Sequence, residues 1–83
     1  MIVKHIANSI TTSGVREETR IKETSGVNFS KEFNGEGYVV WCSYDNDNHV
    51  LYYGYKEKFD KVREEIENKI KNGDLFLDFT KYV

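Results

Sequence analysis

Cysteine and histidine are the residue types in this chain best suited to nucleophilic or acid–base chemistry. Cys42 and His49 flank one predicted turn, a spacing that could bring a thiol and an imidazole onto the same face of a hairpin. The surroundings argue against catalysis, because the apolar stretch around Cys42 raises a thiol pKa and makes the sulfur unreactive. No further group is placed to orient the histidine. We therefore expect a buried structural cysteine, and His5, an isolated histidine in an alternating segment, carries no motif.

Acidic and amide side chains gather at several points. The run Asp45-Asn46-Asp47-Asn48 places oxygen ligands at alternate positions, as the start of a calcium-binding loop does. The glycine and the closing glutamate of such a loop are missing, so we interpret the run as a turn, a role that suits Asn and Asp. The other carboxylates of interest lie in charge runs typical of a solvated surface, with nothing to set two of them across a cleft: Glu17, Glu18, Glu23 and Glu32.

Metal and cofactor motifs are also missing. Two histidines and one cysteine, far apart along the chain, do not make a zinc spacing pattern, and the glycines are isolated turn residues rather than a phosphate loop. The sequence therefore predicts no catalytic residue, no metal ligand and no cofactor. An enzyme is the least expected class of protein.

Length and composition predict one small domain over residues 1–83. With 31% charged residues, 39% hydrophobic residues and a net charge of −2, the chain has a globular composition and lacks a strongly basic footprint for duplex DNA. No apolar run is long enough for a membrane helix, and the first residues do not form a signal peptide. A single cysteine suits a reducing compartment, so we expect a cytoplasmic protein that does not bind membranes.

Residue usage gives an indication of origin. Lysine far outnumbers arginine, Asn, Ile, Tyr and Phe are plentiful, and Ala is scarce. Apart from the absence of proline and the scarcity of leucine, AT-rich codons produce such a composition. Proteins of phages and mobile elements often have it, as do proteins of many AT-rich bacteria.

The elements that must position any functional side chain centre on a hairpin over residues 38–44 and 49–55. Both of its strands are apolar or aromatic on both faces, so one helix can cover only one of the two surfaces. A two-residue loop at Asn46-Asp47 would place Trp41 opposite Tyr52 and Ser43 opposite Val50. A three-residue loop would change these pairs.

The remaining elements complete an α+β prediction. Turn signals every 10–12 residues or so indicate an antiparallel meander of about four to six strands. Within it, residues 15–23 fit a polar edge strand better than a short helix, and residues 29–33 are of unclear type. Apolar residues at helical spacing predict one amphipathic helix over residues 56–72, packed across one face of the sheet and capped at Gly73. Residues 75–83 are predicted as a last strand, with Leu75, Leu77 and Phe79 toward the core and parallel to residues 49–55 if they share a sheet.

The surplus of aromatic surface on the hairpin is the best indication of function. Tyr and Trp dominate protein-binding surfaces, so the leading hypothesis is a small non-enzymatic module that binds another protein. The composition suggests a phage or mobile-element inhibitor that occludes a host enzyme or defence factor. The alternatives are a single-stranded nucleic-acid binder using the same aromatic face, and a homodimeric structural or regulatory protein paired through its last strand. The expected partner-binding residues are Trp41, Tyr44, Tyr52, Tyr53 and Tyr55.

Overall fold

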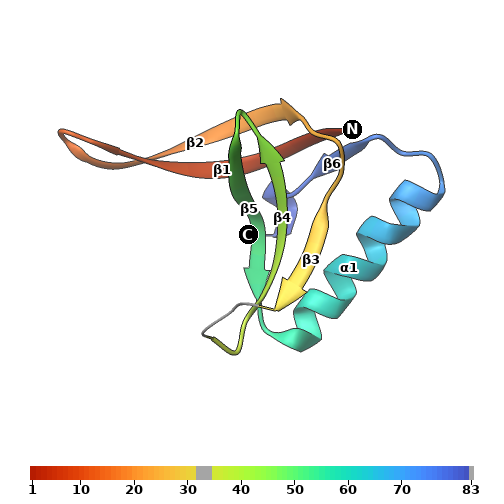
Figure 1. Ribbon diagram of the computed structural model, residues 1–83. Helices are drawn as coiled ribbons and strands as arrows, with labels where there is room; N and C mark the ends of the chain where they lie inside the picture. The colour runs from red at the N-terminus through yellow and green to blue at the C-terminus, as the bar shows by residue number, and fades with distance from the viewer. Residues whose placement is uncertain (32–34, 83) are drawn as a thin grey trace.

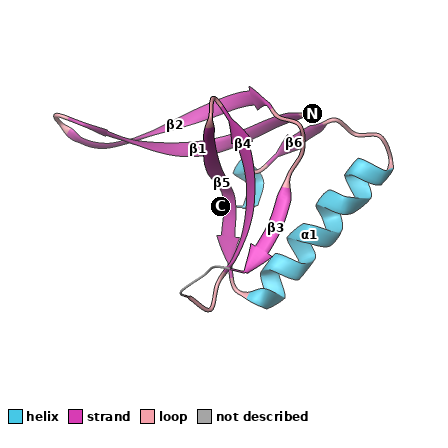
Figure 2. Ribbon diagram, in the orientation of Figure 1, coloured by secondary structure: helices cyan, strands magenta, loops and turns pink. Residues whose placement is uncertain are grey.

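The computed structural model describes residues 1–31 and 35–82, and it contains two three-stranded sheets and one α-helix (Figures 1 and 2). One sheet has the strand order β2-β1-β6 and the other the order β3-β4-β5. In chain order the elements are β1 (Ile2–Thr11), β2 (Gly14–Glu23), β3 (Asn28–Lys31), β4 (Tyr38–Tyr44), β5 (Asp47–Gly54), α1 (Lys56–Lys71), β6 (Phe76–Asp78) and a short 3₁₀ helix, Thr80–Tyr82. The α+β class with one main helix is confirmed.

The two sheets correct the prediction of one meander. Strands β1 and β2 form an antiparallel ribbon, and the chain then leaves that ribbon to begin a second sheet at β3. Strand β6 returns to the first sheet and pairs with β1 in parallel, which brings the end of the chain beside its beginning. Turn spacing predicted the number of strands well, but it carries no information on which strands pair across long separations.

The β1–β2 ribbon settles residues 15–23 as a strand. Its register runs without interruption from Ile2 opposite Glu23 to Thr11 opposite Gly14. The distal half of the ribbon extends away from the rest of the molecule in Figure 1. The side chains there are open to solvent, with Ile10 90% and Val15 71% exposed. The two ten-residue strands, joined by a polar turn, therefore form an arm. The tip of this arm is exposed to solvent among the described residues.

The β4–β5 hairpin forms with a different register from the predicted one. Its two-residue loop is Asp45-Asn46, and both residues have positive φ, 51° and 66°, as a type I′ turn requires. Trp41 therefore lies opposite Val50, whereas the predicted loop at Asn46-Asp47 placed it opposite Tyr52. Four consecutive Asx residues fit either loop, so turn chemistry alone could not choose between them.

A β-bulge in the same hairpin changes which side chains are buried. The register shifts between Val40 and Trp41, so that Val40 lies opposite Tyr52 and Leu51 is left without a partner in the ladder. Leu51 and Tyr52 both become buried, at 7% and 8% exposure, although they are neighbours in a strand. A bulge permits this because the extra residue interrupts the alternation of faces.

Helix α1 follows the predicted pattern closely. Phe59, Val62 and Ile66 are its buried residues, Asn72 caps it, and Gly73 follows with a φ of +81°. That left-handed conformation is one that glycine adopts without strain. No helix in the described part of the chain is long and apolar enough to cross a membrane.

The predicted last strand is shorter than expected and lies elsewhere. Only Phe76–Asp78 is a strand, and it pairs with β1 rather than β5. Asp78 ends it, because its Oδ1 accepts hydrogen bonds from the backbone N–H and the hydroxyl of Thr80, which opens the 3₁₀ helix. Leu77 and Phe79 are buried as predicted, whereas Leu75 is 64% exposed and does not reach the core. Val83 lies outside the described residues, as do residues 32–34 in the segment of unclear type.

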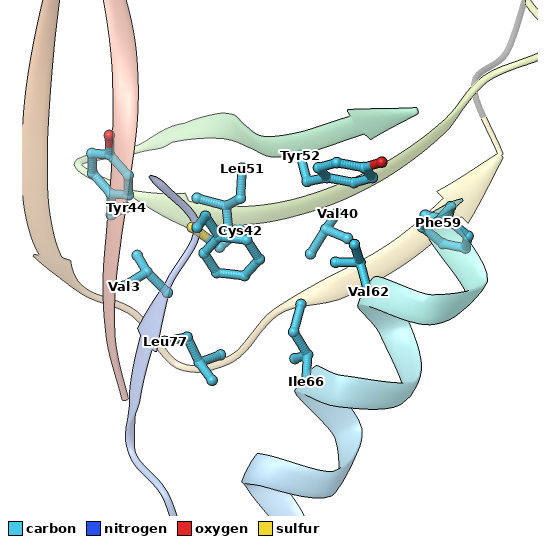
Figure 3. Packing of buried hydrophobic residues seen from close by; sticks show 11 residues of the cluster. Val3, Val40, Cys42, Tyr44, Leu51, Tyr52, Phe59, Val62, Ile66 and Leu77 are labelled. Carbon is cyan, nitrogen blue, oxygen red and sulfur yellow. The ribbon is translucent and has the colours of Figure 1, made fainter. Parts of the chain in front are cut away.

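The core lies between the two sheets and the helix (Figure 3). Val40 and Cys42 of β4, fully buried, face Val3 of β1 and Leu77 of β6 as well as the apolar side of α1. The helix and the β2-β1-β6 sheet thus share one face of the β3-β4-β5 sheet. The opposite face of that sheet is left without a covering element among the described residues.

Candidate partner-binding surface

The face of the β3-β4-β5 sheet turned away from the helix carries four adjacent apolar or aromatic side chains. We call this surface the Trp41 face and define it as Val39, Trp41, Val50 and Tyr53. The register places Trp41 opposite Val50 and Val39 opposite Tyr53, so the four lie on two rungs of one hairpin. Val50 is 55% and Tyr53 is 52% exposed, and the other two are partly exposed. These side chains are therefore exposed to solvent on paired strands.

The described residues that flank the Trp41 face in the strand register are polar and uncharged. Strand β3 places Asn28 beside Trp41 and Ser30 beside Val39. Toward the turn, the next rung pairs Ser43 with Asn48, and the Ser43 hydroxyl is hydrogen-bonded to the Asn48 side chain. An apolar centre with a neutral polar rim is the composition of a protein-binding surface rather than of a phosphate-binding one.

Gly37 holds the aromatic ring at one end of this face. A Cβ atom at Gly37 would overlap the outer ring atoms and the hydroxyl of Tyr53. The Tyr53 ring therefore lies directly over the backbone of the residue that precedes β4. The absence of a side chain at position 37 leaves room for this ring.

The five predicted partner-binding residues do not form one surface. Trp41 and Tyr53 lie together on the Trp41 face, and Tyr55 is 71% exposed at the start of α1, beside Lys58. Tyr44 and Tyr52 are buried, at 7% and 8% exposure, so they are not available to a partner. Tyr52 is turned inward by the bulge at Leu51, and its hydroxyl end lies against Gly54, where a Cβ atom would overlap it. Val39 and Val50 belong to the face but were missed, because their exposure depends on the register.

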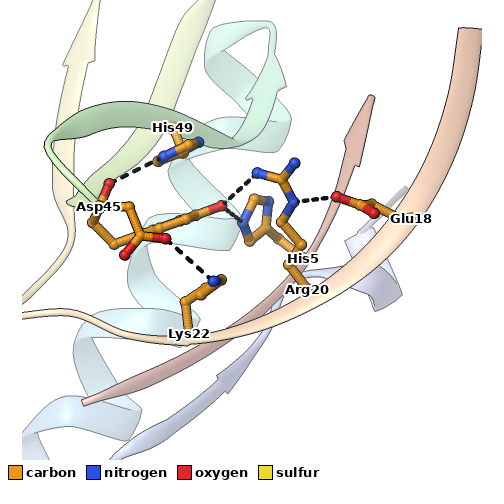
Figure 4. A network of polar contacts seen from close by, with 7 residues as sticks. His5, Glu18, Arg20, Lys22, Asp45 and His49 are labelled. Carbon is orange, nitrogen blue, oxygen red and sulfur yellow. Dashed lines mark hydrogen bonds and ion pairs between the residues drawn. The ribbon is translucent and has the colours of Figure 1, made fainter. Parts of the chain in front are cut away.

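Tyr44 is the centre of a polar network that the sequence did not indicate (Figure 4). Its hydroxyl is 2.8 Å from Nε2 of His5 and accepts a hydrogen bond from Nη1 of Arg20 at 3.3 Å. Nε of Arg20 also donates to Glu18 at 2.6 Å. The ring of His49 stacks on the Tyr44 ring, and Nε2 of His49 is 3.3 Å from the Tyr44 carbonyl oxygen. The network joins β1, β2, β4 and β5, so it ties the base of the ribbon to the second sheet.

Burial determines the protonation state of the His5 imidazole. His5 is 2% exposed, and this burial is the largest effect on the imidazole and lowers its pKa. A contact with the Ile6 backbone raises the pKa by a smaller amount, and the charges of His49 and Arg20 lower it further. Nδ1 of His5 is buried, and no hydrogen-bond partner of good geometry for it is found among the described residues. The imidazole is therefore neutral at physiological pH, and the network acts as a structural connection.

The candidate nucleophile and metal ligands do not assemble into a reactive site. Cys42 lies opposite His49 in the register, but the thiol is fully buried and burial raises its pKa. Over residues 1–31 and 35–82, no group of three His, Cys, Asp or Glu side chains is arranged to hold a metal ion. Glu17, Glu18 and Glu23 are exposed on β2, and Glu32 lies outside the described residues.

Comparison of the chain with protein-family models, with curated proteins and with solved structures finds no match.

Proposed function

We propose that this chain is a small, non-enzymatic protein-binding module that docks onto another protein through the Trp41 face. One observation supports this most strongly. The helix and the second sheet share one side of the β3-β4-β5 sheet and leave Val39, Trp41, Val50 and Tyr53 together on the other. Contiguous apolar and aromatic side chains on a rigid, open sheet face are typical of protein interaction sites.

The charge around the Trp41 face favours a protein partner over single-stranded nucleic acid. Base stacking on Trp and Tyr normally comes with a cationic groove that follows the phosphates. The side chains that flank this face on the neighbouring strand positions are neutral: Asn28, Ser30, Ser43 and Asn48. Nucleic-acid binding is therefore the second candidate.

The role we propose for such a module is occlusion. A phage or mobile-element protein that covers a functional surface of a host enzyme or defence factor in the cytoplasm needs a docking face and no chemistry of its own. The residue usage, which is typical of AT-rich codons, supports this origin. Self-association through the last strand is the third candidate. It is less favoured, because β6 has three residues and offers only a small area to a partner strand.

An affinity capture from the lysate of a candidate host tests the proposal. The tagged chain, a Trp41→Ala variant, a Val50→Lys variant and a Glu64→Ala control on the exposed side of α1 are compared, each with and without nuclease. Thermal unfolding followed by circular dichroism establishes that all four chains are folded.

The proposal expects one stoichiometric protein that survives nuclease, is retained by Glu64→Ala and is lost by both face variants. Capture that is unchanged in folded Trp41→Ala and Val50→Lys would refute docking through this face. Partners that vanish with nuclease would move nucleic-acid binding to first place. A dimeric mass by light scattering that is lost in a folded Phe76→Lys variant, at an exposed position of β6, would favour self-association.

A further inference from the structure

Strand β5 presents a free edge close to the Tyr44 network. In a hairpin closed by a two-residue type I′ turn, the residues that flank the loop, Tyr44 and Asp47, form a hydrogen-bonded pair, and such pairs alternate along the ladder. Asn48 and Val50 therefore direct their N–H and C=O groups away from β4. Strand β5 is the outer strand of its sheet, and no backbone hydrogen bond from these two residues to another described segment is found. These groups are open to an added strand.

A groove runs beside this edge. Its volume is about 460 Å³, and it lies between β5 and the base of the β1–β2 ribbon. The residues that line it include His5 and Asn8 of β1, Arg20 of β2, and Asn48, His49 and Val50 of β5. None of the residues that line the groove is acidic, and Arg20 is the charged one.

The Arg20 guanidinium is held in a fixed position at the groove. Glu18 binds its Nε and the Tyr44 hydroxyl binds its Nη1, which leaves the other N–H groups without partners among the described residues. Its side chain is 28% exposed, so these N–H groups remain within reach of a ligand. A guanidinium that is already oriented loses little conformational entropy when it binds a carboxylate in the two-pronged manner typical of arginine.

We propose that this groove binds an extended acidic peptide segment, which adds to β5 as a further strand and places a carboxylate on Arg20. The peptide backbone pairs with Asn48 and Val50, as in other cases of β-strand addition. A side chain beside His49 on the same face of the extended sheet points toward the ribbon, where Arg20 lies. An aspartate or glutamate at that position would accept hydrogen bonds from the Arg20 N–H groups that Glu18 and Tyr44 do not bind.

This inference rests on the proposal that the chain is a protein-binding module, and it assigns the chemistry of a second contact, at the β5 edge that adjoins the Trp41 face. Selection of displayed random short peptides on the immobilised chain tests it. Enriched peptides are then synthesised with their acidic residue intact and with the matching amide, and their affinities are measured for the parent chain and for three variants: Arg20→Gln, Glu18→Gln and Asn48→Pro.

The expected result is a set of enriched peptides with Asp or Glu among β-branched residues. Arg20→Gln and the amide peptide should each weaken binding about tenfold or more, as loss of a charged hydrogen-bond partner does. Asn48→Pro should weaken it as well, because the edge N–H is removed at a position where an edge strand tolerates proline. Glu18→Gln should strengthen binding, since it removes the competing carboxylate from Arg20, and a purely structural role for Arg20 does not produce that gain.

Several outcomes would overturn the inference. These are no enrichment, enriched peptides without acidic residues, equal affinity for the folded Arg20→Gln variant, or bound peptides that leave hydrogen exchange at Asn48 and Val50 unchanged. Binding of an oligonucleotide or free phosphate in place of the peptides, lost in Arg20→Gln, would assign the groove to phosphate instead. Trp41 does not line the groove, so the Trp41→Ala arm of the capture experiment is independent of these results and the two proposals can fail separately.

Discussion

The imidazole of His49 lies flat on the phenol ring of Tyr44, with ring centroids 3.6 Å apart and planes inclined by 7°. The hydroxyl of the same tyrosine contacts His5 and Arg20, so Tyr44 joins the turn of one hairpin to the base of the other. The Lys22–Asp45 ion pair, at 3.2 Å, also joins β2 to this turn. Tyr44 therefore contributes to the way the ribbon is oriented against the sheet that carries the Trp41 face, together with the Thr24–Ser43 hydrogen bond.

Removal of the Tyr44 hydroxyl tests this connection. Tyr44→Phe keeps the ring and its stacking on His49 but leaves Nε2 of His5 buried without its partner. We expect a loss of about 1–3 kcal/mol in the free energy of unfolding, the usual cost of an unsatisfied buried polar group. Urea denaturation measures it. Tyr38→Phe is the control, because the Tyr38 ring stacks on Phe59 and no hydrogen bond of its hydroxyl is found within the described residues. Equal losses in the two variants would contradict the assignment.

The pH dependence of stability should reveal the buried His5. Burial, the largest effect, lowers its pKa from 6.5, so below that pH the unfolded chain binds a proton that the folded chain does not. The free energy of unfolding should therefore fall as the pH drops through 6.5. Hydrogen bonds, from Lys81 to Glu65 and from Thr80 to Asp78, lower the pKa of both carboxyl groups from 4.5 and 3.8, so their contributions are lost only at lower pH.

The measurement is urea denaturation between about pH 8 and about pH 5, above the range in which those carboxyl groups titrate. His5→Gln replaces the imidazole by an amide that does not titrate, and it should flatten the profile in this range. Groups that face His5, namely Tyr44, Arg20 and His49, are unchanged in that variant. A profile that keeps its slope in His5→Gln would show that another group is responsible.

The C-terminal segment should stabilise the fold through one aromatic ring and not the other. Phe79 is 1% exposed in the core and Phe76 is 45% exposed on the outer side of β6. Phe79→Ala should cost about 3–5 kcal/mol in the free energy of unfolding, as large truncations in a core do. Phe76→Ala should cost less than about 1 kcal/mol. Chemical denaturation compares them, and Phe79→Leu keeps a measurable folded baseline if the alanine variant unfolds. Similar costs at both positions would contradict the placement of the segment.

Local patterns were sufficient for some elements and not for others. The helix was predicted because its apolar residues recur with the helical period, and residues 15–23 because Val15 and Ile21 are too few to anchor a helix. The face that Tyr52 and Tyr53 occupy was not predictable, since it depends on a bulge at Leu51 that no glycine marks. Contacts of the Tyr44 network join residues 39 positions apart, and no spacing within one element encodes them.

Part of the candidate site was likewise predictable from the sequence, and part was not. Trp41 and Tyr53 were identified from residue type, since aromatic residues beyond what one core can bury must lie on a surface. Whether that surface stays open depended on where the N-terminal strands pack. They joined the helix on one side of the β3-β4-β5 sheet, because Val3 and Leu77 meet Val40 and Cys42 there.

Two glycine substitutions in the turn distinguish the observed register from the predicted one with opposite signs. In the observed hairpin Asn46 is a central turn residue with a φ of 66°, and Asp47 is the first residue of β5. Asn46→Gly should raise the free energy of unfolding by a few tenths to about 1 kcal/mol, because glycine is preferred at the second central position of a type I′ turn. Asp47→Gly should lower it by about 0.5–1 kcal/mol, because glycine weakens a strand. Thermal or urea unfolding of both variants decides the matter: stabilisation by Asp47→Gly together with destabilisation by Asn46→Gly would restore the loop at Asn46-Asp47 and remove Trp41 from its place opposite Val50.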